Sequence, residues 1–367
     1  MPKDEKSHRA VRIARALQLA FLVLVILPVI LVTAVAYVNS RQALQDEIRH
    51  RLRQDASVLV QGVDAFMFER LENLRGWQRL SVMQDAQVND VDKRLADFLQ
   101  QLKTSYGGIY TELLFVDPGG RVVASSEPFD IDSGISNLGA PVEQVLLGGT
   151  GIEIMPLQRD RQLNTAVLPL RTAVQSDFET EPLGWLYAFL DWHEVEAILD
   201  RVTGGGEVDA FRFAILLDRV NRPLGHSATG AIPRIGKEVA VLDAVQSQLD
   251  GAASVIVPAR EKHDALMGTL EIPSSPTSDD GLLVGYAVSS GFQHFRGFGW
   301  RVVVAESMDT AFAPVRHLLW LLLLVLLVTV VISVFLAARL GAWISGPIAR
   351  LAEYSNHCGD ELSPAAP

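Results

Sequence analysis

Cysteine is nearly absent from this chain of 367 residues, and the one cysteine, Cys358, lies close to the C-terminal end. No disulfide can therefore form within the chain, and there is no Cys-X-X-Cys pair to hold zinc. The eight histidines include no pair at the i, i+4 spacing of a helical metal site. We predict no metal site, and the fold must be held by its hydrophobic core.

The motifs of common catalytic classes are also missing. There is no Gly-X-Ser-X-Gly elbow, and Gly204-Gly205-Gly206 lacks the Lys-Ser or Lys-Thr of a phosphate-binding loop. Asp191, His193 and Glu194 fall within four residues, but such a short cluster is more typical of a helix start than of a metal site. Nothing in the sequence predicts catalysis or a cofactor.

Positive charge is in short supply between residues 39 and 316. This segment carries 25 Lys and Arg against 38 Asp and Glu, and the whole chain has a net charge of -11. An acidic surface repels phosphate groups, so nucleic acid is not an expected partner.

Long apolar segments, in contrast, are present at both ends. Residues 16–38 carry no charge and follow a basic stretch, and residues 317–340 carry no charge before Arg339. Each is long enough to cross about 30 Å of hydrocarbon, and the basic N-terminal flank predicts a cytoplasmic N-terminus. A cleaved signal peptide is the alternative for the first segment, since Ala34-Val35-Ala36 resembles a cleavage site; its length favours an anchor. We predict an inner (plasma) membrane protein with both termini in the cytoplasm.

Residues 38–85 are predicted to continue the first span as one long helix. Apolar residues follow at steps of three and four, at Leu44, Ile48, Leu52, Ala56, Leu59, Val63, Phe66, Leu74 and Trp77. The stripe could pack on the sheets of its own domain. Its spacing also fits a heptad seam, so pairing with a second copy of the chain is the alternative.

The rest of the outer segment alternates at period two and predicts two α+β units in tandem. The first has a helix at 91–104, strands at 111–117, 121–126, 151–157, 165–170 and 184–191, and a helix at 192–201. The second has strands at 211–218, 253–257, 265–272, 282–289 and 300–306, and a helix at 237–249. Gly204-Gly205-Gly206 predicts the linker between them.

The order of these segments resembles a known receptor architecture. It runs from the first span and long helix through FVDPGGRVVASS, LGWLYAFLDWHEVEAILD, ILLDRVNRPLGH and GWRVVVAE to the second span. This order resembles the double Cache sensor domain of bacterial transmembrane receptors, and SGPIARLAEYSNHCGDELSP resembles the start of a HAMP relay domain. The resemblance implies an α+β fold of two tandem PAS-like (Cache) units on a long N-terminal helix, flanked by two transmembrane helices.

The resemblance also implies a division of the chain and its partners. The expected parts are a cytoplasmic terminus 1–15, spans 16–38 and 317–340, a distal unit 39–203, a proximal unit 204–313 and a partial HAMP 341–367. Such receptors commonly work as homodimers, with the distal unit binding a small molecule. Because the chain stops within the HAMP connector, we expect it to be a fragment whose output module, of kinase, cyclase, phosphatase or chemotaxis type, lies elsewhere.

The strand at 184–191 carries the candidate ligand-binding residues. Alternation places Trp185, Tyr187, Phe189 and Asp191 on one face, which could hold a cationic ligand through aromatic rings and a carboxylate. The resemblance assigns an amine-binding Asp to the position of Asp191, but the carboxylate-binding residues of the amino-acid branch have no counterpart in residues 126–139. Ordinary core packing for the rings and helix capping by Asp191 are the alternatives.

Two arginines complete the candidate site. Arg121 and Arg171 lie at ends of expected strands of the first unit, where they could meet an anionic ligand or be solvated. Together these features predict a membrane-anchored receptor that relays ligand binding through the second span. A membrane-tethered enzyme and a structural dimerisation module are the alternatives.

Overall fold

The computed structural model describes residues 4–127, 134–135, 138–159, 165–177, 180–203, 212–227, 267–272, 281–308, 317, 319–336 and 339. The chain divides into two compact units: unit 1 is Met1–Glu47 with Phe312–Pro367, and unit 2 is Ile48–Ala311. The expected helix at 237–249, the strand at 253–257, the glycine linker and the HAMP segment 341–367 all lie outside the described residues.

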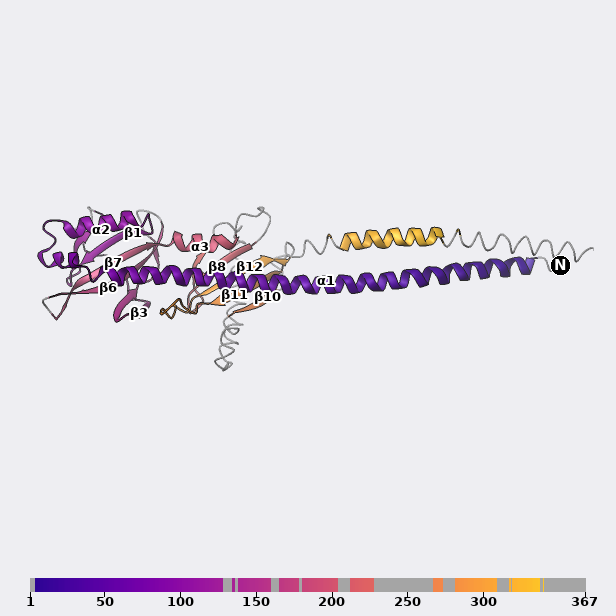
Figure 1. Cartoon of the computed structure of the whole chain (residues 1–367), viewed down its shortest axis with the longest axis horizontal. Helices are drawn as coiled ribbons and strands as arrows, with labels where there is room; N and C mark the ends of the chain where they lie inside the picture. Colours follow the sequence, from indigo (N-terminus) through magenta and orange to yellow (C-terminus); the bar gives the residue numbers. More distant parts are fainter. Residues whose placement is uncertain are drawn as a thin grey trace, which may run out of the picture. The chain divides into compact units, whose positions relative to one another are not determined.

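One helix, α1 (Asp4–Trp77), begins in unit 1 and runs beside the strands of unit 2 (Figure 1). The predicted apolar stripe is confirmed in unit 2, where it is buried within the chain itself, at Ile48, Leu52, Ala56, Leu59, Val63, Leu74 and Trp77. Phe66 is only half-buried, and Met67 takes the inward place.

The helix ends at Trp77 rather than near Asp85 as predicted. Leu80 adopts an extended conformation, and a 3₁₀ helix, η1 (Ser81–Val88), follows. Met83 and Ala86 of η1 are buried. Their spacing therefore continued the helical period in the sequence although the backbone had already changed direction.

Unit 2 contains two sheets. The first sheet is antiparallel and has seven strands in the order β2-β1-β7-β6-β4-β3, with β5 paired to β6. Its strands are β1 (Tyr110–Val116), β2 (Val122–Ser125), β3 (Glu143–Leu147), β4 (Thr150–Ile154), β5 (Gln158–Arg159), β6 (Ala166–Gln175) and β7 (Pro182–Asp191). The helix α2 (Arg94–Ser105) packs on β1 and β2, and the helix α3 (His193–Thr203) follows β7 along the chain. The predicted strands are confirmed, and β3 and β5 are additional.

The second sheet of unit 2 has five strands in the order β10-β11-β12-β8-β9. Its strands are β8 (Arg212–Leu217), β9 (Pro223–His226), β10 (Met267–Ile272), β11 (Leu282–Val288) and β12 (Arg301–Ser307). The sequence did not predict β9. The fold is therefore the expected α+β arrangement of two antiparallel sheets with one long N-terminal helix.

The first hairpins of the two sheets have the same construction. In β1–β2 the amide of Leu113 donates to the hydroxyl of Ser126 at 3.0 Å, and in β8–β9 the amide of Ala214 donates to Ser227 at 3.0 Å. The separation is 13 residues in both pairs. An aspartate, Asp117 or Asp218, begins each turn and accepts a backbone N–H four residues on. This correspondence confirms the internal repeat expected from the sequence.

Polar contacts fix α1 to the second sheet. Arg51 donates to the buried Glu306 of β12 at 2.8 Å, and Asp55 pairs with Arg212 of β8. A tight approach accompanies them, because a Cβ added at Gly285 of β11 would lie 2.5 Å from the backbone carbon of Leu52. Only glycine allows the helix to lie this close to the strand.

The segment between β11 and β12 also contacts one face of α1. Asp64 accepts hydrogen bonds from the Ser289 hydroxyl at 2.7 Å and the Gly291 amide at 2.9 Å. Farther along the helix, the rings of Phe68 and His294 meet edge to face at 4.9 Å, and His294 Nε2 lies 3.0 Å from Glu72. Because Asp64, Phe68 and Glu72 are spaced by four residues, they lie on one side of α1.

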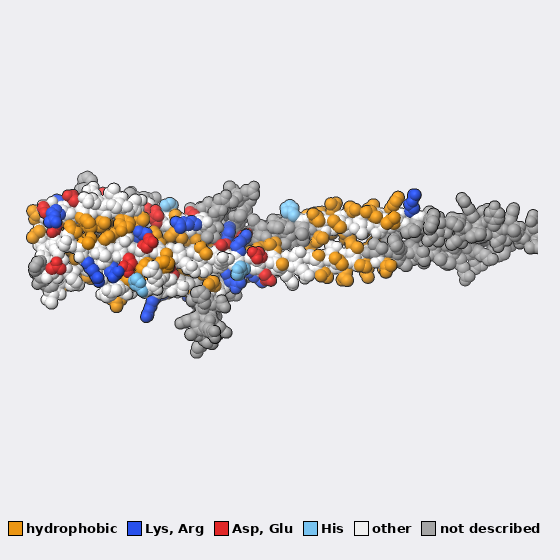
Figure 2. All heavy atoms as spheres, in the orientation of Figure 1, with side chains coloured by type: hydrophobic (Ala, Val, Ile, Leu, Met, Phe, Trp, Pro, Cys, Tyr) orange, Lys and Arg blue, Asp and Glu red, His pale blue; other side chains and the backbone are white. Residues whose placement is uncertain are grey.

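Unit 1 contains the apolar segments. Both α1 and the helix Leu319–Leu336 are long and apolar enough to cross a membrane, with mean hydropathy of 1.3 in a window of Ile26–Trp77 and 3.1 in Leu319–Leu336. Figure 2 shows hydrophobic side chains along the C-terminal helix, where many are exposed. These helices agree with the two predicted spans; the domain boundaries and the topology stay predictions.

Candidate functional site

The two faces of β7 have different neighbours, as the alternation predicts. Leu186, Ala188 and Leu190 are fully buried on one face. On the other face Tyr187 is 4% exposed and belongs to a core cluster, against which Trp185 and Phe189 pack half-buried. The remaining members of that cluster are Leu114, Val116, Val122, Leu138 and Met155. We call this second face of the first sheet the aromatic face.

A row of polar side chains crosses the aromatic face at the level of Tyr187. Strand register places Glu153 opposite Arg171 and Arg171 opposite Tyr187. Arg171 donates to the carboxylate of Glu153 at 2.6 Å and to the hydroxyl of Tyr187 at 3.0 Å. Its guanidinium also lies 4.6 Å from the ring centroid of Trp185. The cation–π position that the sequence offered to a ligand is thus taken by an arginine of the chain.

The positive charge of Arg171 is balanced by the negative charge of Glu153, and hydrogen bonds hold both side chains in place. Burial alone would lower the pKa of Arg171, but its hydrogen bonds to Tyr187 and Glu153 raise the pKa overall. The guanidinium therefore stays charged at every physiological pH, and its Nε and Nη2 atoms both lie 2.6 Å from the same carboxylate oxygen of Glu153. Glu153 was not among the sequence-predicted residues, because its contact depends on strand register rather than on local spacing.

Asp191 lies at the end of β7, where it accepts a hydrogen bond from the amide of His193 at 3.0 Å. This is the capping contact expected at the start of α3. The carboxylate is half-buried, so capping leaves part of it accessible. A ligand-binding role for Asp191 stays a prediction.

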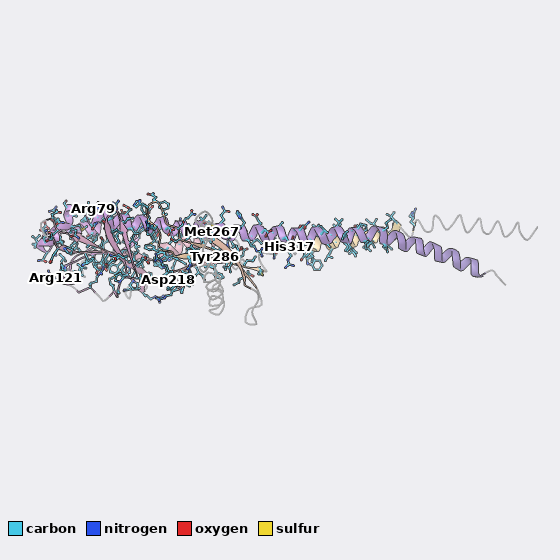
Figure 3. The ribbon with its side chains drawn as sticks, turned by 90° about the horizontal axis from the view of Figure 1, so that it is seen from below. Arg79, Arg121, Asp218, Met267, Tyr286 and His317 are labelled. Atoms are coloured by element: carbon cyan, nitrogen blue, oxygen red, sulfur yellow. The ribbon has the colours of Figure 1, made fainter. Side chains whose placement is uncertain are left out.

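Arg121 is in a different environment from Arg171. Its side chain is 47% exposed, pairs with Asp117 at 3.3 Å and donates to the amide oxygen of Asn89 at 2.7 Å. In Figure 3, Arg121 and Arg79 lie at the same end of unit 2 but on opposite sides of it. The structure therefore joins Arg171, Trp185 and Tyr187 in one cluster, whereas Arg121 belongs to the β1–β2 turn.

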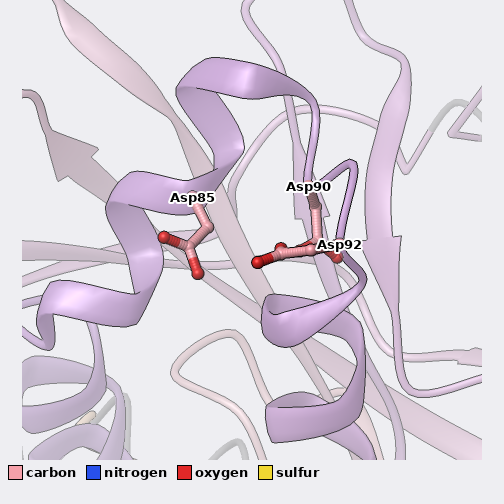
Figure 4. Close-up of side chains that lie close together, drawn as sticks. All are labelled: Asp85, Asp90 and Asp92. Carbon is pink, nitrogen blue, oxygen red and sulfur yellow. The ribbon is translucent and has the colours of Figure 1, made fainter.

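Three carboxylates come together between η1 and α2, at Asp85, Asp90 and Asp92 (Figure 4). Both oxygens of the buried Asp90 accept amides at the start of α2, from Leu95 and Ala96, each at 2.9 Å. Arg94 lies 3.5 Å from Asp85. The arrangement is explained by helix capping and charge pairing, and we assign no cation to it.

The architecture defines the class of fold. Two antiparallel sheets that share one long helix and repeat the same first hairpin form the double Cache sensor fold, which was expected from the order of segments.

Comparison with known proteins agrees on the fold. No family model and no curated protein matches the sequence. The ligand-binding domain of the Campylobacter jejuni chemoreceptor Tlp3 in complex with L-norvaline matches with a TM-score of 0.50 at 13% identity, covering 74% of this chain and 95% of that chain. The ligand-binding domain of the Pseudomonas fluorescens chemoreceptor CtaA in complex with L-serine gives 0.44 at 11% identity, covering 72% and 99%. At such identities the similarity to Tlp3 establishes the fold alone.

Proposed function

We propose that this chain is the sensory part of a transmembrane receptor. A small molecule would bind on the aromatic face of the first sheet of unit 2. The observation that carries the proposal is the polar row of Glu153, Arg171 and Tyr187 set into an otherwise apolar sheet face. Ligand sites are typically apolar surfaces with a few convergent polar groups. The two apolar helices and the sensor fold support attachment to a membrane.

The expected ligand is a small molecule with both an amine and an acidic group. Arg171 provides a fixed positive charge for the acidic group, and Glu153 and Asp191 provide negative charge for the amine. The aromatic and aliphatic side chains of this face would contact the apolar part of the ligand. The Tlp3 and CtaA domains are described in complex with L-norvaline and L-serine, which fit this class.

Transmission would follow the contacts of α1 and β12. Ligand binding would favour one of two packings of the first sheet on α1, and α1 is joined to β12 through Arg51 and Glu306. We propose that the change then reaches the second span, the HAMP segment and an output module in a homodimer. The mechanism requires a ligand that binds one packing more tightly, by tens- to thousands-fold for about 2–4 kcal/mol.

The test is a titration of the full chain in lipid nanodiscs with L-amino acids, simple amines and simple carboxylic acids. We expect binding by amino acids, with at least about tenfold weaker affinity in Arg171→Gln because a charge-assisted bond is lost. Asp191→Asn retains a capping residue and should weaken the binding of amines selectively. Arg94→Gln, at a side chain 65% exposed on α2, is the matched control.

Two results would contradict the proposal. One is the failure of all three compound classes to bind. The other is binding that neither Arg171→Gln nor Asp191→Asn changes, which would place the ligand away from the aromatic face.

A further inference from the structure

A groove of about 490 Å³ opens at the first sheet, lined by the start of η1 and by residues of β4 and β6. We call it the β4–β6 groove; Arg79, labelled in Figure 3, lies on its rim. Its volume is within the range of small-molecule sites, roughly 300–1,000 Å³. Amide side chains recur around it, at Gln78, Gln84, Gln144 and Gln175.

The floor of the groove is a hydrogen-bonded network of amide and hydroxyl groups, to which Arg79 also donates at 3.5 Å through the Thr150 hydroxyl. Gln78 donates to the hydroxyl of Thr150 at 2.7 Å, and Thr172 donates to the carbonyl of Gly151 at 3.0 Å. Thr150 and Thr172 are 6% and 1% exposed. These contacts fix the positions of donors and acceptors before a ligand arrives, which reduces the ordering required on binding.

Trp185 lines one wall of the groove. Arg171 contacts its ring, and Glu153, which also lines the groove, pairs with Arg171. A planar apolar surface held in this way can stack against the C–H face of a ring-shaped ligand. The wall is therefore rigid and apolar, whereas the floor and rim are polar.

The charges around the groove balance. Arg79 on the rim and Arg171 behind the wall offset Glu153 and Asp177. The remaining polar side chains are amides and hydroxyls, which both donate and accept hydrogen bonds. Hydroxyl groups of a ligand have the same double capacity, whereas an ion would leave part of this lining without a matching group.

We propose that the β4–β6 groove binds a neutral, hydroxyl-rich small molecule, such as a monosaccharide or a polyol. The groove is a second site beyond the proposed function, because the aromatic face takes charged groups at Arg171 and Asp191. The two sites share Trp185 and Glu153, so a ligand at one changes the wall of the other.

The test is a calorimetric titration of the full chain in lipid nanodiscs with D-glucose, maltose and myo-inositol, each up to roughly 10 mM, sufficient for millimolar dissociation constants. Gly151→Leu places an isobutyl group in the groove, and its Cβ would meet only Gln144 Nε2 at 3.7 Å, an ordinary contact distance. Gln144→Leu removes one amide from the lining. Gln101→Leu, at an exposed residue of α2, is the control.

We expect at least one of these compounds to bind. Affinity should fall at least about tenfold in Gly151→Leu and severalfold in Gln144→Leu, and it should be unchanged in Gln101→Leu. The absence of binding by all three compounds, or binding that Gly151→Leu leaves intact, would overturn the proposal. If amino acids still bind to Gly151→Leu, the proposed site on the aromatic face is independent of the groove, and only the groove proposal fails.

Discussion

Replacing Asp64 with alanine should loosen the contact between α1 and the segment that follows β11. Asp64 is 1% exposed and accepts hydrogen bonds from the Ser289 hydroxyl and the Gly291 amide. The Ser289 hydroxyl can rotate toward another acceptor, but the Gly291 amide has a fixed direction. An unpaired buried donor costs about 1–3 kcal/mol, and a bond to a charged group contributes about 1.5–3 kcal/mol.

The net loss is smaller than the sum of these terms, because burial of the Asp64 charge is itself unfavourable. Burial raises the pKa of Asp64, and the hydrogen bonds from Ser289 and Gly291 lower it only in part. We therefore expect Asp64→Ala to reduce the free energy of unfolding by about 2–3 kcal/mol. In a unit of this size the unfolding midpoint should fall by about 4–10 °C.

The assay is thermal unfolding of the full chain in nanodiscs, followed by tryptophan fluorescence. Ser289→Ala, which removes one of the two donors, should lower the midpoint by less than Asp64→Ala does. A midpoint within about 1 °C of the wild type for Asp64→Ala would refute the reasoning, since it would show that these hydrogen bonds add nothing beyond what water provides.

The pKa of Asp64 also predicts how this effect depends on pH. A carboxyl group whose pKa is raised in the folded state binds more protons there than in the unfolded chain. The folded state is therefore favoured at low pH, and this contribution is lost as the pH rises from about 3.8 through the raised pKa. Relative to Asp64→Asn, the wild type should lose stability over that interval; a difference independent of pH would contradict the assignment.

Two further predictions concern the faces of α1. Gly285→Ala should destabilise unit 2 by about 1–3 kcal/mol, because its Cβ would meet the backbone of Leu52, whereas Gly76→Ala, with no atom within 4 Å, should be neutral or stabilising in the same unfolding assay. Val58 is 56% exposed on α1. In a homodimer that pairs through this face, Val58→Cys in a Cys358→Ser background should form a cross-linked dimer on oxidation; a chain that stays monomeric would exclude this face from the dimer contact.

Local patterns in the sequence predicted most elements of the fold. Strands such as β12 carry unbroken β-branched runs, and the Asp191 cap involves residues only two positions apart, so both could be inferred without tertiary information. The edge strand β3 was missed because its burial alternates weakly and its sequence, EQVLL, mixes polar and apolar residues. An edge strand buries little, so the hydrophobic signal is small.

The candidate site was less accessible from the sequence. Trp185 and Tyr187 were predicted to share a face from alternation alone, and they do. Their contact with Arg171, and its pairing with Glu153, depend on the register of three strands, which periodicity cannot provide. For the same reason the groove, formed by segments from 78 to 185 in the sequence, had no local signal.

The contacts of α1 limit what a ligand can do to this fold. A ligand at 100 times its dissociation constant stabilises its preferred state by about 2.7 kcal/mol. Release of α1 from the second sheet would break the Arg51–Glu306 pair, in which only Glu306 is buried, the Asp55–Arg212 pair and the hydrogen bonds of Asp64 to Ser289 and Gly291. Release would also expose Leu52, which is fully buried against Gly285 of β11, at a cost of about 1.5–3 kcal/mol beyond the lost polar contacts. In the proposed receptor a ligand would therefore not detach the helix, and a signal would arise between two packings that both keep these contacts. The two packings would then differ in the first sheet, because its row of Glu153, Arg171 and Tyr187, proposed above to bind the ligand, is separate from these contacts.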